Sequence, residues 1–236
     1  MEKQYEDRNL TYTDDGRLLD ENGFAIMMDW EDPIMEKSAE IICQNGGRVL
    51  NVGFGMGIID SYIEEYDIEE HWIIEAHPDV YKKMFDDGWH LKPHVKILLG
   101  DWRWYLPYLP KFDGIYIDTW NEEFFEFHEY LPNILKEDGV YSFFNNVSHN
   151  KVNKDLLIRE TDYEYLKDIC DIEVERISLD RVDSKDLQTP NGLHYWPEEN
   201  NFFYCPKITL KKWQTILTPT TTKVEVKNKY NTQRWL

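Results

Sequence analysis

The sequence has 236 residues, 42% of them hydrophobic and 15% aromatic, so it can bury the core of one compact α/β domain. Its formal net charge of −19 argues against binding to nucleic acid or anionic membranes and would attract a cationic substrate, although such acidity more often only keeps a protein soluble. No run of 18 apolar residues occurs and the N-terminus is charged, so we expect neither a transmembrane helix nor a signal peptide.

The first 25 residues are polar and rich in turn signals, such as Asp14-Asp15-Gly16 and Asn22-Gly23. We expect residues 1–25 to form an N-terminal segment that covers the functional site. Beyond them, short apolar runs alternate with amphipathic segments. Strands are predicted over residues 48–52, 71–75, 95–99, 112–117 and 139–145. Helices are predicted over residues 34–44, 56–65, 78–87 and 122–136.

This alternation predicts an α/β, Rossmann-like fold with a doubly wound, mostly parallel sheet. The strands are continuous apolar runs, as expected for strands that are buried on both faces. After residue 150 the pattern changes to a predicted helix over 153–169 and two strands near 173–178 and 201–210, which should form an antiparallel C-terminal hairpin. We expect the domain to span residues 26–210 and residues 211–236 to form a loose tail.

A glycine-rich turn, from Gly53 to Gly57, joins the first of these buried strands to a helix. Glycine permits a tight turn and lets a ligand approach the backbone closely. A dinucleotide-binding turn needs a further glycine where this sequence has Ile58, so the G-x-G-x-G spacing favours a nucleoside with an amino-acid tail. Glu75 ends the next strand, where its carboxylate can accept hydrogen bonds from both ribose hydroxyls. The alternative is an ordinary strand–helix turn followed by a surface glutamate.

Two other predicted strands are followed by polar or aromatic residues. Asp118 follows the strand at 112–117, and Asp101 and Trp102 follow the strand at 95–99. Ligands of open α/β sheets bind beyond the carboxyl ends of the strands, so these side chains should line one crevice.

Other chemistries are disfavoured by the cysteines and histidines. Cys43, Cys170 and Cys205 are odd in number and far apart, without disulfide or metal spacing, which fits a reducing, cytoplasmic setting. His90 and His94 are four residues apart, but a proline between them breaks the helix that would align them. We therefore expect no metal ion.

Five segments of the sequence resemble one methyltransferase family. They are MMDWEDPIM from Met27, GGRVLNVGFGMGIID from Gly46, HWIIEAHPDVYKKM from His71, DGIYIDTW from Asp113 and GVYSFFNN from Gly139. The family contains guanidinoacetate N-methyltransferase and the fungal type IV, or δ-nitrogen, protein arginine methyltransferase. The resemblance covers residues 20–150 and, more thinly, the C-terminal hairpin. It implies a class I, Rossmann-like methyltransferase that uses S-adenosylmethionine.

The resemblance also assigns residues to this cofactor, whose product is S-adenosylhomocysteine. The methionine part is implied to lie against Phe54, Gly55, Met56, Gly57, Ile58 and Ile59. The ribose and adenine are implied to contact Glu75, Ala76, His77, Asp101 and Trp102. Met27 and Met35 match methionines that flank the sulfonium, and Asp118 lies near it, although core packing is the commoner role of methionine.

For the substrate, Glu31 and Asp118 match two carboxylates that hold a guanidinium in this family. Without the family pattern, Glu31 would be interpreted as a solvated surface acid. Asn146 and Val147 match a backbone pair that binds the substrate carboxylate in guanidinoacetate N-methyltransferase, which has an apolar residue and Thr there. The segment over 139–145 is more similar to the fungal type.

A guanidinium is a planar cation with a pKa above about 12, and its delocalised lone pairs make it a poor nucleophile. Methylation requires that one nitrogen is held in line with the methyl donor and that its proton is accepted as the C–N bond forms. We assign Asp118 as the proton acceptor that orients the substrate, and Glu31 as the second carboxylate that binds it.

We therefore predict an S-adenosylmethionine-dependent N-methyltransferase that acts on a guanidino group. A small guanidino acid, guanidinoacetate or arginine, is favoured because the sequence shows no appended recognition domain. The alternatives are a δ-nitrogen protein arginine methyltransferase and a cofactor-binding module without turnover, and intact Glu31, Glu75 and Asp118 argue against the module. We expect a small cationic substrate, no nucleic acid or membrane partner, and a monomer or homodimer.

Overall fold

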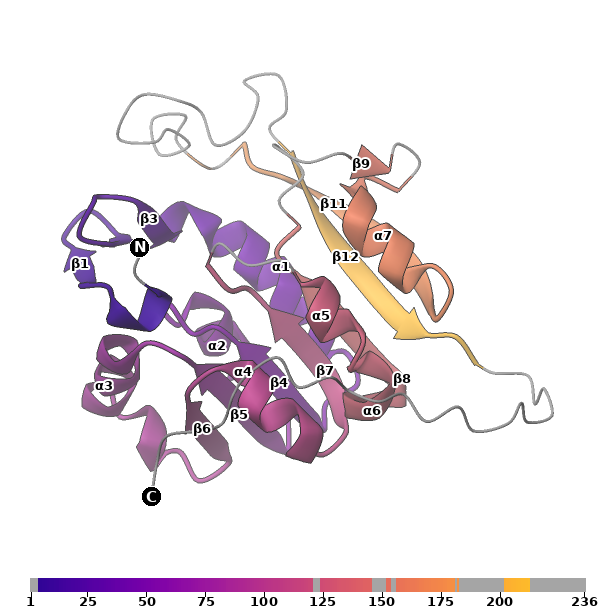
Figure 1. The fold of residues 1–236 in the computed structure, drawn as a ribbon, viewed down its shortest axis with the longest axis horizontal. Helices are drawn as coiled ribbons and strands as arrows, with labels where there is room; N and C mark the ends of the chain where they lie inside the picture. The colour runs from indigo at the N-terminus through magenta and orange to yellow at the C-terminus, as the bar shows by residue number, and fades with distance from the viewer. Residues whose placement is uncertain are drawn as a thin grey trace.

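A computed structural model of the chain describes residues 4–120, 124–145, 152–153, 156–180, 182 and 202–212. Its centre is a seven-stranded sheet in the order β11-β12-β8-β7-β4-β5-β6 (Figure 1). These strands are β4 (Arg48–Val52), β5 (Glu70–Glu75), β6 (Val95–Leu99), β7 (Phe112–Ile117), β8 (Leu135–Phe143), β11 (Cys170–Ser178) and β12 (Phe202–Leu210). Strands β4 to β8 pair in parallel, whereas β12 pairs antiparallel with both β8 and β11. The predicted fold class is confirmed, including the C-terminal hairpin.

Helices cover both faces of this sheet. The first face carries α1 (Asp32–Cys43), α2 (Ile58–Ile63), α3 (Pro78–Asp86) and the 3-10 turn η3 (Trp89–Leu91). The second face carries α4 (Trp102–Tyr105), the 3-10 turn η4 (Leu106–Tyr108), α5 (Phe125–His128), α6 (Leu131–Ile134) and α7 (Glu160–Leu166). Among the described residues, none of the helices is both long and apolar enough to cross a membrane.

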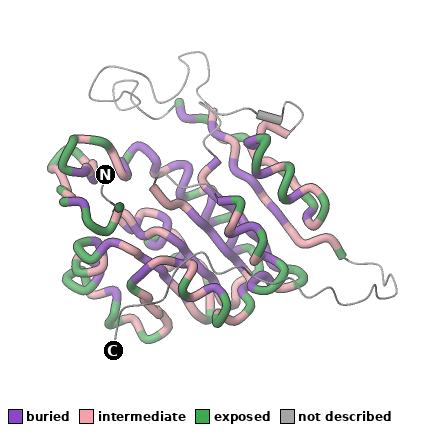
Figure 2. Tube along the Cα trace, in the orientation of Figure 1, coloured by how far each residue is buried: buried purple, intermediate pink, exposed green. Residues whose placement is uncertain are grey.

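The continuous apolar runs in the strands follow from this double cover. In β4, Val49 packs into the core on the first face and Leu50 into the core on the second face. In β5, Ile73 packs into the core on the first face and Ile74 into the core on the second face. Successive side chains of a strand point to opposite faces, so a sheet covered on both sides needs apolar residues at every position. Figure 2 shows the resulting band of buried residues through the central strands.

The N-terminal segment contains a small antiparallel sheet that the sequence analysis did not predict. It consists of β1 (Thr11–Thr13), β2 (Arg17–Leu19) and β3 (Ala25–Met28), preceded by the 3-10 turn η1 (Tyr5–Asp7). The predicted turn signals lie between its strands, and Gly16 has a φ of +79°, a left-handed conformation that favours glycine. The strands were missed because each is only three or four residues long.

The single helix predicted over 122–136 is wrong for the described part of that range. The chain forms α5, then α6, and enters β8 at Leu135. Pro132 lies in the first turn of α6, where its missing N–H costs nothing, but it cannot continue a helix that arrives from α5.

The helix predicted over 153–169 is also wrong in its first half. Strands β9 (Val152–Asn153) and β10 (Ile158–Arg159) pair antiparallel, and α7 begins only at Glu160. The side-chain amide of Asn145 donates to the carbonyl of Leu157 at 3.0 Å and to that of Tyr204 at 2.9 Å. Leu157 has a φ of +55°, which no right-handed helix contains. A tertiary contact therefore overrides the local helical pattern. The predicted tail beyond Lys212 lies outside the described residues.

The contact between β7 and α1 can be tested at Gly114. A Cβ built there would lie 2.1 Å from the carbonyl oxygen of Ile42, so Gly114→Ala forces helix and sheet apart. We expect a loss of about 1–3 kcal/mol or more in the free energy of unfolding, measured by urea denaturation. Gly23→Ala is the control, because Gly23 has a left-handed backbone but nothing within 4 Å, so it should cost only about 1 kcal/mol. Equal losses in the two variants would refute the close approach.

Candidate active site

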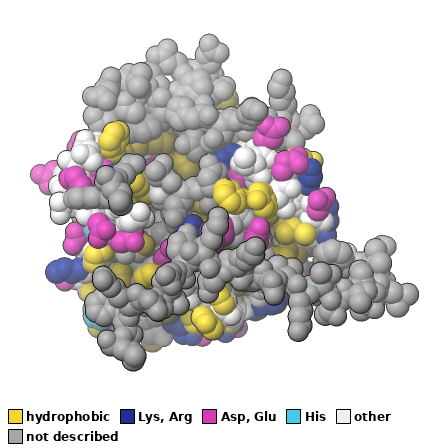
Figure 3. Space-filling view, in the orientation of Figure 1, with side chains coloured by type: hydrophobic (Ala, Val, Ile, Leu, Met, Phe, Trp, Pro, Cys, Tyr) yellow, Lys and Arg dark blue, Asp and Glu magenta, His cyan; other side chains and the backbone are white. Residues whose placement is uncertain are grey.

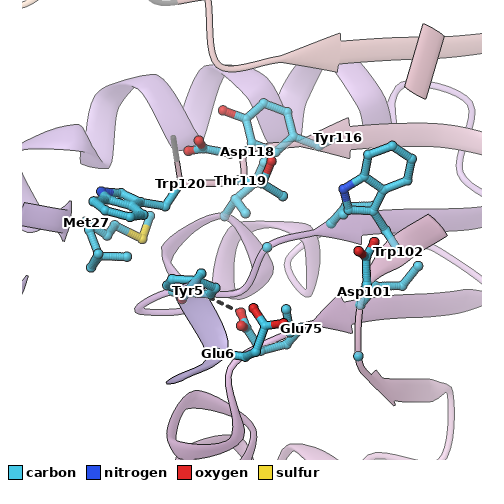
Figure 4. Close-up of a pocket in the computed structure, with 18 of the residues that line it drawn as sticks. Tyr5, Glu6, Met27, Glu75, Asp101, Trp102, Tyr116, Asp118, Thr119 and Trp120 are labelled. Carbon is cyan, nitrogen blue, oxygen red and sulfur yellow. Dashed lines mark hydrogen bonds between the residues drawn. The ribbon is translucent and has the colours of Figure 1, made fainter. Parts of the chain in front are cut away.

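A cavity of about 320 Å³ opens beyond the carboxyl ends of the parallel strands. Its lining includes the residues at the ends of β4, β5 and β7, namely Val52, Gly53, Ile74, Glu75, Ala76, Tyr116 and Asp118. Nine residues that the sequence analysis assigned to the cofactor line it, namely Met27, Met35, Gly55, Ile59, Glu75, Ala76, Asp101, Trp102 and Asp118. Figure 4 shows Asp101 and Trp102 on one side of the cavity, with Tyr5, Met27 and Trp120 on the other.

The glycine turn lies where β4 ends between its two neighbours. The Gly53 N–H donates to the Ile74 carbonyl at 2.9 Å, and the Asp118 N–H donates to the Val52 carbonyl at 2.9 Å. Gly53 has a φ of +96°, and a Cβ there would lie 1.9 Å from the carbonyl oxygen of Asp118. Glycine is therefore required by both conformation and space, and the turn is fixed directly beside Asp118.

Glu75 is buried at the end of β5, 2% exposed. Its Oε2 accepts hydrogen bonds from the backbone of Phe54 at 2.9 Å and of Gly55 at 3.5 Å, and its Oε1 accepts one from His77 at 2.7 Å. A carboxylate offers about four lone-pair sites, so acceptor capacity remains for hydroxyl groups in the cavity. Burial raises the pKa of Glu75, and these three backbone hydrogen bonds oppose that rise. Glu75 thus orders the glycine turn in addition to facing the cavity.

The far side of the cavity is formed by the residues after β6. The Asp101 carboxylate caps α4 by accepting a hydrogen bond from the Arg103 N–H at 2.8 Å. Trp102 is buried, and its ring packs edge-on against Phe127 with centroids 5.3 Å apart. The Arg103 guanidinium lies 4.0 Å from the Trp102 ring centroid. The indole is therefore held rigidly, as an aromatic platform for a base would be.

Met27 and Met35 line the cavity from β3 and α1. The sulfur of Met27 accepts a hydrogen bond from the Met56 N–H at 3.2 Å, and a Cβ on Gly55 would lie 2.7 Å from it. Met27 therefore packs directly on the glycine turn and ties β3 to it.

Glu31 and Asp118 form an electrostatically coupled pair of carboxylates. Glu31 follows β3 in the 3-10 turn η2 (Asp29–Glu31), where its Oε1 accepts a hydrogen bond from the Met28 N–H at 3.1 Å. Burial, together with the negative charge of Asp118, raises the pKa of Glu31 well above its usual range. Burial raises the pKa of Asp118 to about 7, although the nearby Arg159 guanidinium pulls it down. At neutral pH the pair therefore retains a proton that two solvated acids would have released.

Residues near the N-terminus also line the cavity, and the sequence analysis did not single them out. The Tyr5 ring lies 5.2 Å from that of His77 and 6.3 Å from that of Trp120, measured between centroids. The Arg8 guanidinium lies 4.3 Å from the Trp120 ring and pairs with the buried Asp20 at 2.6 Å. In the sequence, the only feature that could have indicated these cavity residues is the presence of aromatic and basic side chains within an otherwise polar segment.

Several assigned residues do not themselves line the cavity. Phe54, Met56, Gly57, Ile58, His77 and Glu31 are not among the described residues that line it. His77 caps α3, because its Nδ1 accepts from the Asp79 N–H at 3.1 Å, and its Nε2 donates to the Arg8 carbonyl at 2.8 Å. Asn146 and Val147 lie outside the described residues. No group of three metal-ligating side chains occurs within the described ranges.

Comparison with known proteins places the chain in a family. A sequence profile described as guanidinoacetate N-methyltransferase matches residues 1–196. The chain belongs to the guanidinoacetate N-methyltransferase family. This confirms the resemblance seen in the five sequence segments.

Curated relatives carry the name protein arginine N-methyltransferase 2. The chain is 37% identical over 227 residues to the protein from Yarrowia lipolytica, an alignment that covers 85% of this chain and 46% of that protein. It is 35% identical over 219 residues to the protein from Saccharomyces cerevisiae, an alignment that covers 85% of this chain and 51% of that protein. The chain thus spans about half the length of these relatives.

Solved structures of two other enzymes share the fold. Spermidine synthase from Thermotoga maritima superposes with a TM-score of 0.57 at 17% identity, covering 89% of this chain and 71% of that one. A tRNA (m1A58) methyltransferase from Aquifex aeolicus superposes with a TM-score of 0.50 at 16% identity, and the match covers 80% of this chain and 71% of that one. These likenesses support the Rossmann-like fold.

The carboxylate pair predicts a stability cost that depends on pH. The pKa of Asp118 is about 7 in the folded chain and about 3.9 when unfolded, so the folded state loses stability as pH rises between these values. Asp118→Asn removes the charge that destabilises the folded state at high pH. We therefore expect its melting temperature at pH 8 to exceed that of the wild type by a few degrees, since each kcal/mol of unfolding free energy changes the melting temperature by about 2–4 °C.

The difference should shrink at pH 5, and it can be followed by calorimetry without ligands. Asp67→Asn, at an exposed position, is the control and should show no pH-dependent difference. A melting temperature of Asp118→Asn below the wild type at pH 8 would contradict the raised pKa.

Proposed function

We propose that this chain is an S-adenosylmethionine-dependent N-methyltransferase that methylates a guanidino nitrogen. The observation that carries the proposal is a pair of carboxylates, buried Glu31 and half-buried Asp118, of which Asp118 lines the cavity and its negative charge raises the pKa of Glu31. Two such negative charges repel each other, and a bound cation offsets that repulsion. A guanidinium can pair with both carboxylates through its planar fork of N–H groups.

The lining of the cavity fits the cofactor in the chemistry of its groups. Glu75 provides acceptors for ribose hydroxyls, Trp102 provides a flat aromatic surface for adenine, and the glycine turn leaves room for the amino-acid part. The sulfurs and methyl groups of Met27 and Met35 provide soft, apolar contacts. When bound, S-adenosylmethionine supplies an activated methyl group on a sulfonium.

The carboxylates orient the substrate and take its proton. Asp118 can accept the proton that leaves the guanidino nitrogen, and its pKa of about 7 suits a base that works near neutral pH. Glu31 holds the other side of the guanidinium and, fixed by the Met28 N–H, restricts its orientation. The acidic surface, with Asp and Glu side chains spread over the face in Figure 3, attracts such a cation from solution.

Two substrate classes remain candidates. The description of the family profile favours a small guanidino acid, and the names of the curated relatives favour arginine within a protein. The deciding experiment incubates the chain with methyl-labelled cofactor and a panel of guanidinoacetate, free arginine and arginine peptides, with product identification by mass spectrometry. Label transfer to none of them would refute the proposal and leave a cofactor-binding module.

Cofactor binding can be tested through stability. S-adenosylhomocysteine should raise the melting temperature, because a ligand at a hundred times its Kd stabilises the folded state by about 2.7 kcal/mol. Glu75→Ala should reduce that shift by removing ribose hydrogen bonds and loosening the turn. Glu65→Ala, at an exposed position, should leave it unchanged. If calorimetry detects no binding of either cofactor form to the wild type, the methyltransferase proposal fails.

The roles of the carboxylates can be separated by kinetics. Asp118→Asn keeps the size of the side chain but removes the proton acceptor, so the methylation rate at saturating substrate should fall about a hundred- to ten-thousand-fold. S-adenosylhomocysteine should still bind. Glu31→Gln should raise KM and lower the rate less completely, whereas the exposed control Asp67→Asn should behave as wild type. A normal turnover rate in Asp118→Asn would remove Asp118 from the mechanism.

A further inference from the structure

A buried charged network lies behind the glycine turn. His71, in β5, is fully buried, and both of its ring nitrogens face carboxylates of α2 or of the residue that follows it. Its Nδ1 lies 2.9 Å from Oε1 of Glu64, and its Nε2 lies 3.0 Å from Oδ1 of the buried Asp60. Neither carboxylate belongs to the substrate pair, and the mechanism proposed above does not use this network.

The geometry favours a doubly protonated imidazole. Ionised carboxylates only accept hydrogen bonds, whereas a neutral imidazole has one donor and one acceptor nitrogen. Burial lowers the pKa of His71, but the hydrogen bonds and charges of Asp60 and Glu64 outweigh it and raise the pKa above its usual range. Burial raises the pKa of Glu64, but hydrogen bonds from His71 and Lys92 lower it to about 2. The network is therefore a buried imidazolium between two carboxylates.

Two further side chains contact Glu64 from outside the network. Lys92 Nζ lies 2.7 Å and His94 Nε2 3.0 Å from Oε2 of Glu64, on the outer side of the network. The ring of Trp89 packs edge-on against His71, with centroids 6.1 Å apart, and the ring of Phe54 packs edge-on against Trp89 at 5.3 Å. Phe54 belongs to the glycine turn, so apolar packing also joins the turn to His71.

A polar connection runs from the imidazole to the turn itself. One N–H of the Asn51 side-chain amide is shared between both carboxylate oxygens of Asp60, at 3.0 and 2.9 Å. The same amide nitrogen donates to the carbonyl of Gly53 at 2.9 Å. Asn51 and Asp60 are fully buried, so water cannot replace these bonds. Gly53 lines the cavity, two residues from Asn51.

We propose that His71 is a positioning residue that holds the glycine turn in its cofactor-binding shape through Asp60 and Asn51. The imidazolium fixes Asp60, Asp60 orients the amide of Asn51, and that amide fixes the carbonyl of Gly53. The part of the inference that concerns the cofactor rests on the proposed function, whereas the ordering of the turn does not.

The network makes the ordering of the turn depend on pH. The pKa of His71 is raised in the folded chain, so its contribution is complete below about pH 6.5, the pKa of an unfolded histidine, and is lost as pH rises through the folded value. A neutral imidazole leaves one nitrogen facing a carboxylate without a proton between them. Cofactor affinity should therefore fall at alkaline pH.

The experiment measures the Kd of S-adenosylhomocysteine by calorimetry between pH 6.5 and 9, and amide hydrogen exchange of residues 53–57 in the free protein. In His71→Gln we expect binding about ten- to a hundredfold weaker at pH 6.5, since a buried hydrogen bond to a charged group is lost. Hydrogen exchange should rise in the turn more than in β6, and the KM for the cofactor should rise more than kcat changes.

Asp60→Asn provides a second, conservative variant. The new amide can accept from Asn51 through its oxygen and donate through its nitrogen to a neutral His71. Asp60→Asn should therefore bind S-adenosylhomocysteine with a Kd within a few fold of the wild-type value. Its affinity should no longer fall at alkaline pH. His94→Gln is the matched control, because His94 contacts Glu64 but not Asp60, and it should retain the wild-type affinity and pH profile.

The outcomes separate the two proposals. A wild-type chain that binds no S-adenosylhomocysteine overturns the proposed function. Wild-type binding with an unchanged Kd in His71→Gln overturns the role of His71 alone, and so does an alkaline fall that persists in Asp60→Asn. If His71→Gln does not fold, the pH profile of Asp60→Asn decides.

Discussion

The close approach of Gly53 to the Asp118 carbonyl is the contact on which the site depends. Parallel pairing brings the ends of β4 and β7 together, and only a residue without Cβ allows the chain to leave β4 there. The same pairing places the glycine turn, which we propose holds the cofactor, beside Asp118, which we propose binds the substrate. In the proposed function, the distance between methyl donor and acceptor would thus be determined by backbone geometry, which is stiffer than any pair of side chains.

Around this contact the site is built largely from negative charge. Glu31 and Glu75 are buried and Asp118 is half-buried, and each has a raised pKa. Backbone N–H groups lower the pKa of Glu75 and Glu31, whereas the charge of the Arg159 guanidinium lowers that of Asp118. In the proposed function, a bound cation would offset the repulsion among these carboxylates, so the site would favour cationic over neutral substrates.

The bounds predicted for β6 and β7 match those of the structure at every residue, because each strand is a mainly apolar run between turn signals. The acids at strand ends were also predictable, since topology brings the ends of parallel strands to one edge. The helix predicted over 153–169 is wrong in its first half because the side chain of Asn145, which lies before this range, binds the carbonyls of Leu157 and Tyr204. Arg8 and Tyr5 were missed for the same reason, since Arg8 contacts His77 across 69 residues. Long-range polar contacts leave no periodic signal.

The C-terminal hairpin has a consequence for the segment that joins its two strands. Strands β11 and β12 keep one register over nine consecutive pairs, from Cys170 with Leu210 to Ser178 with Phe202. Both ends of the segment that joins them are therefore anchored by the sheet, whatever its length or sequence. The sheet therefore determines where the chain leaves β11 and where it enters β12, so exchanging residues within the connection should leave this register unchanged.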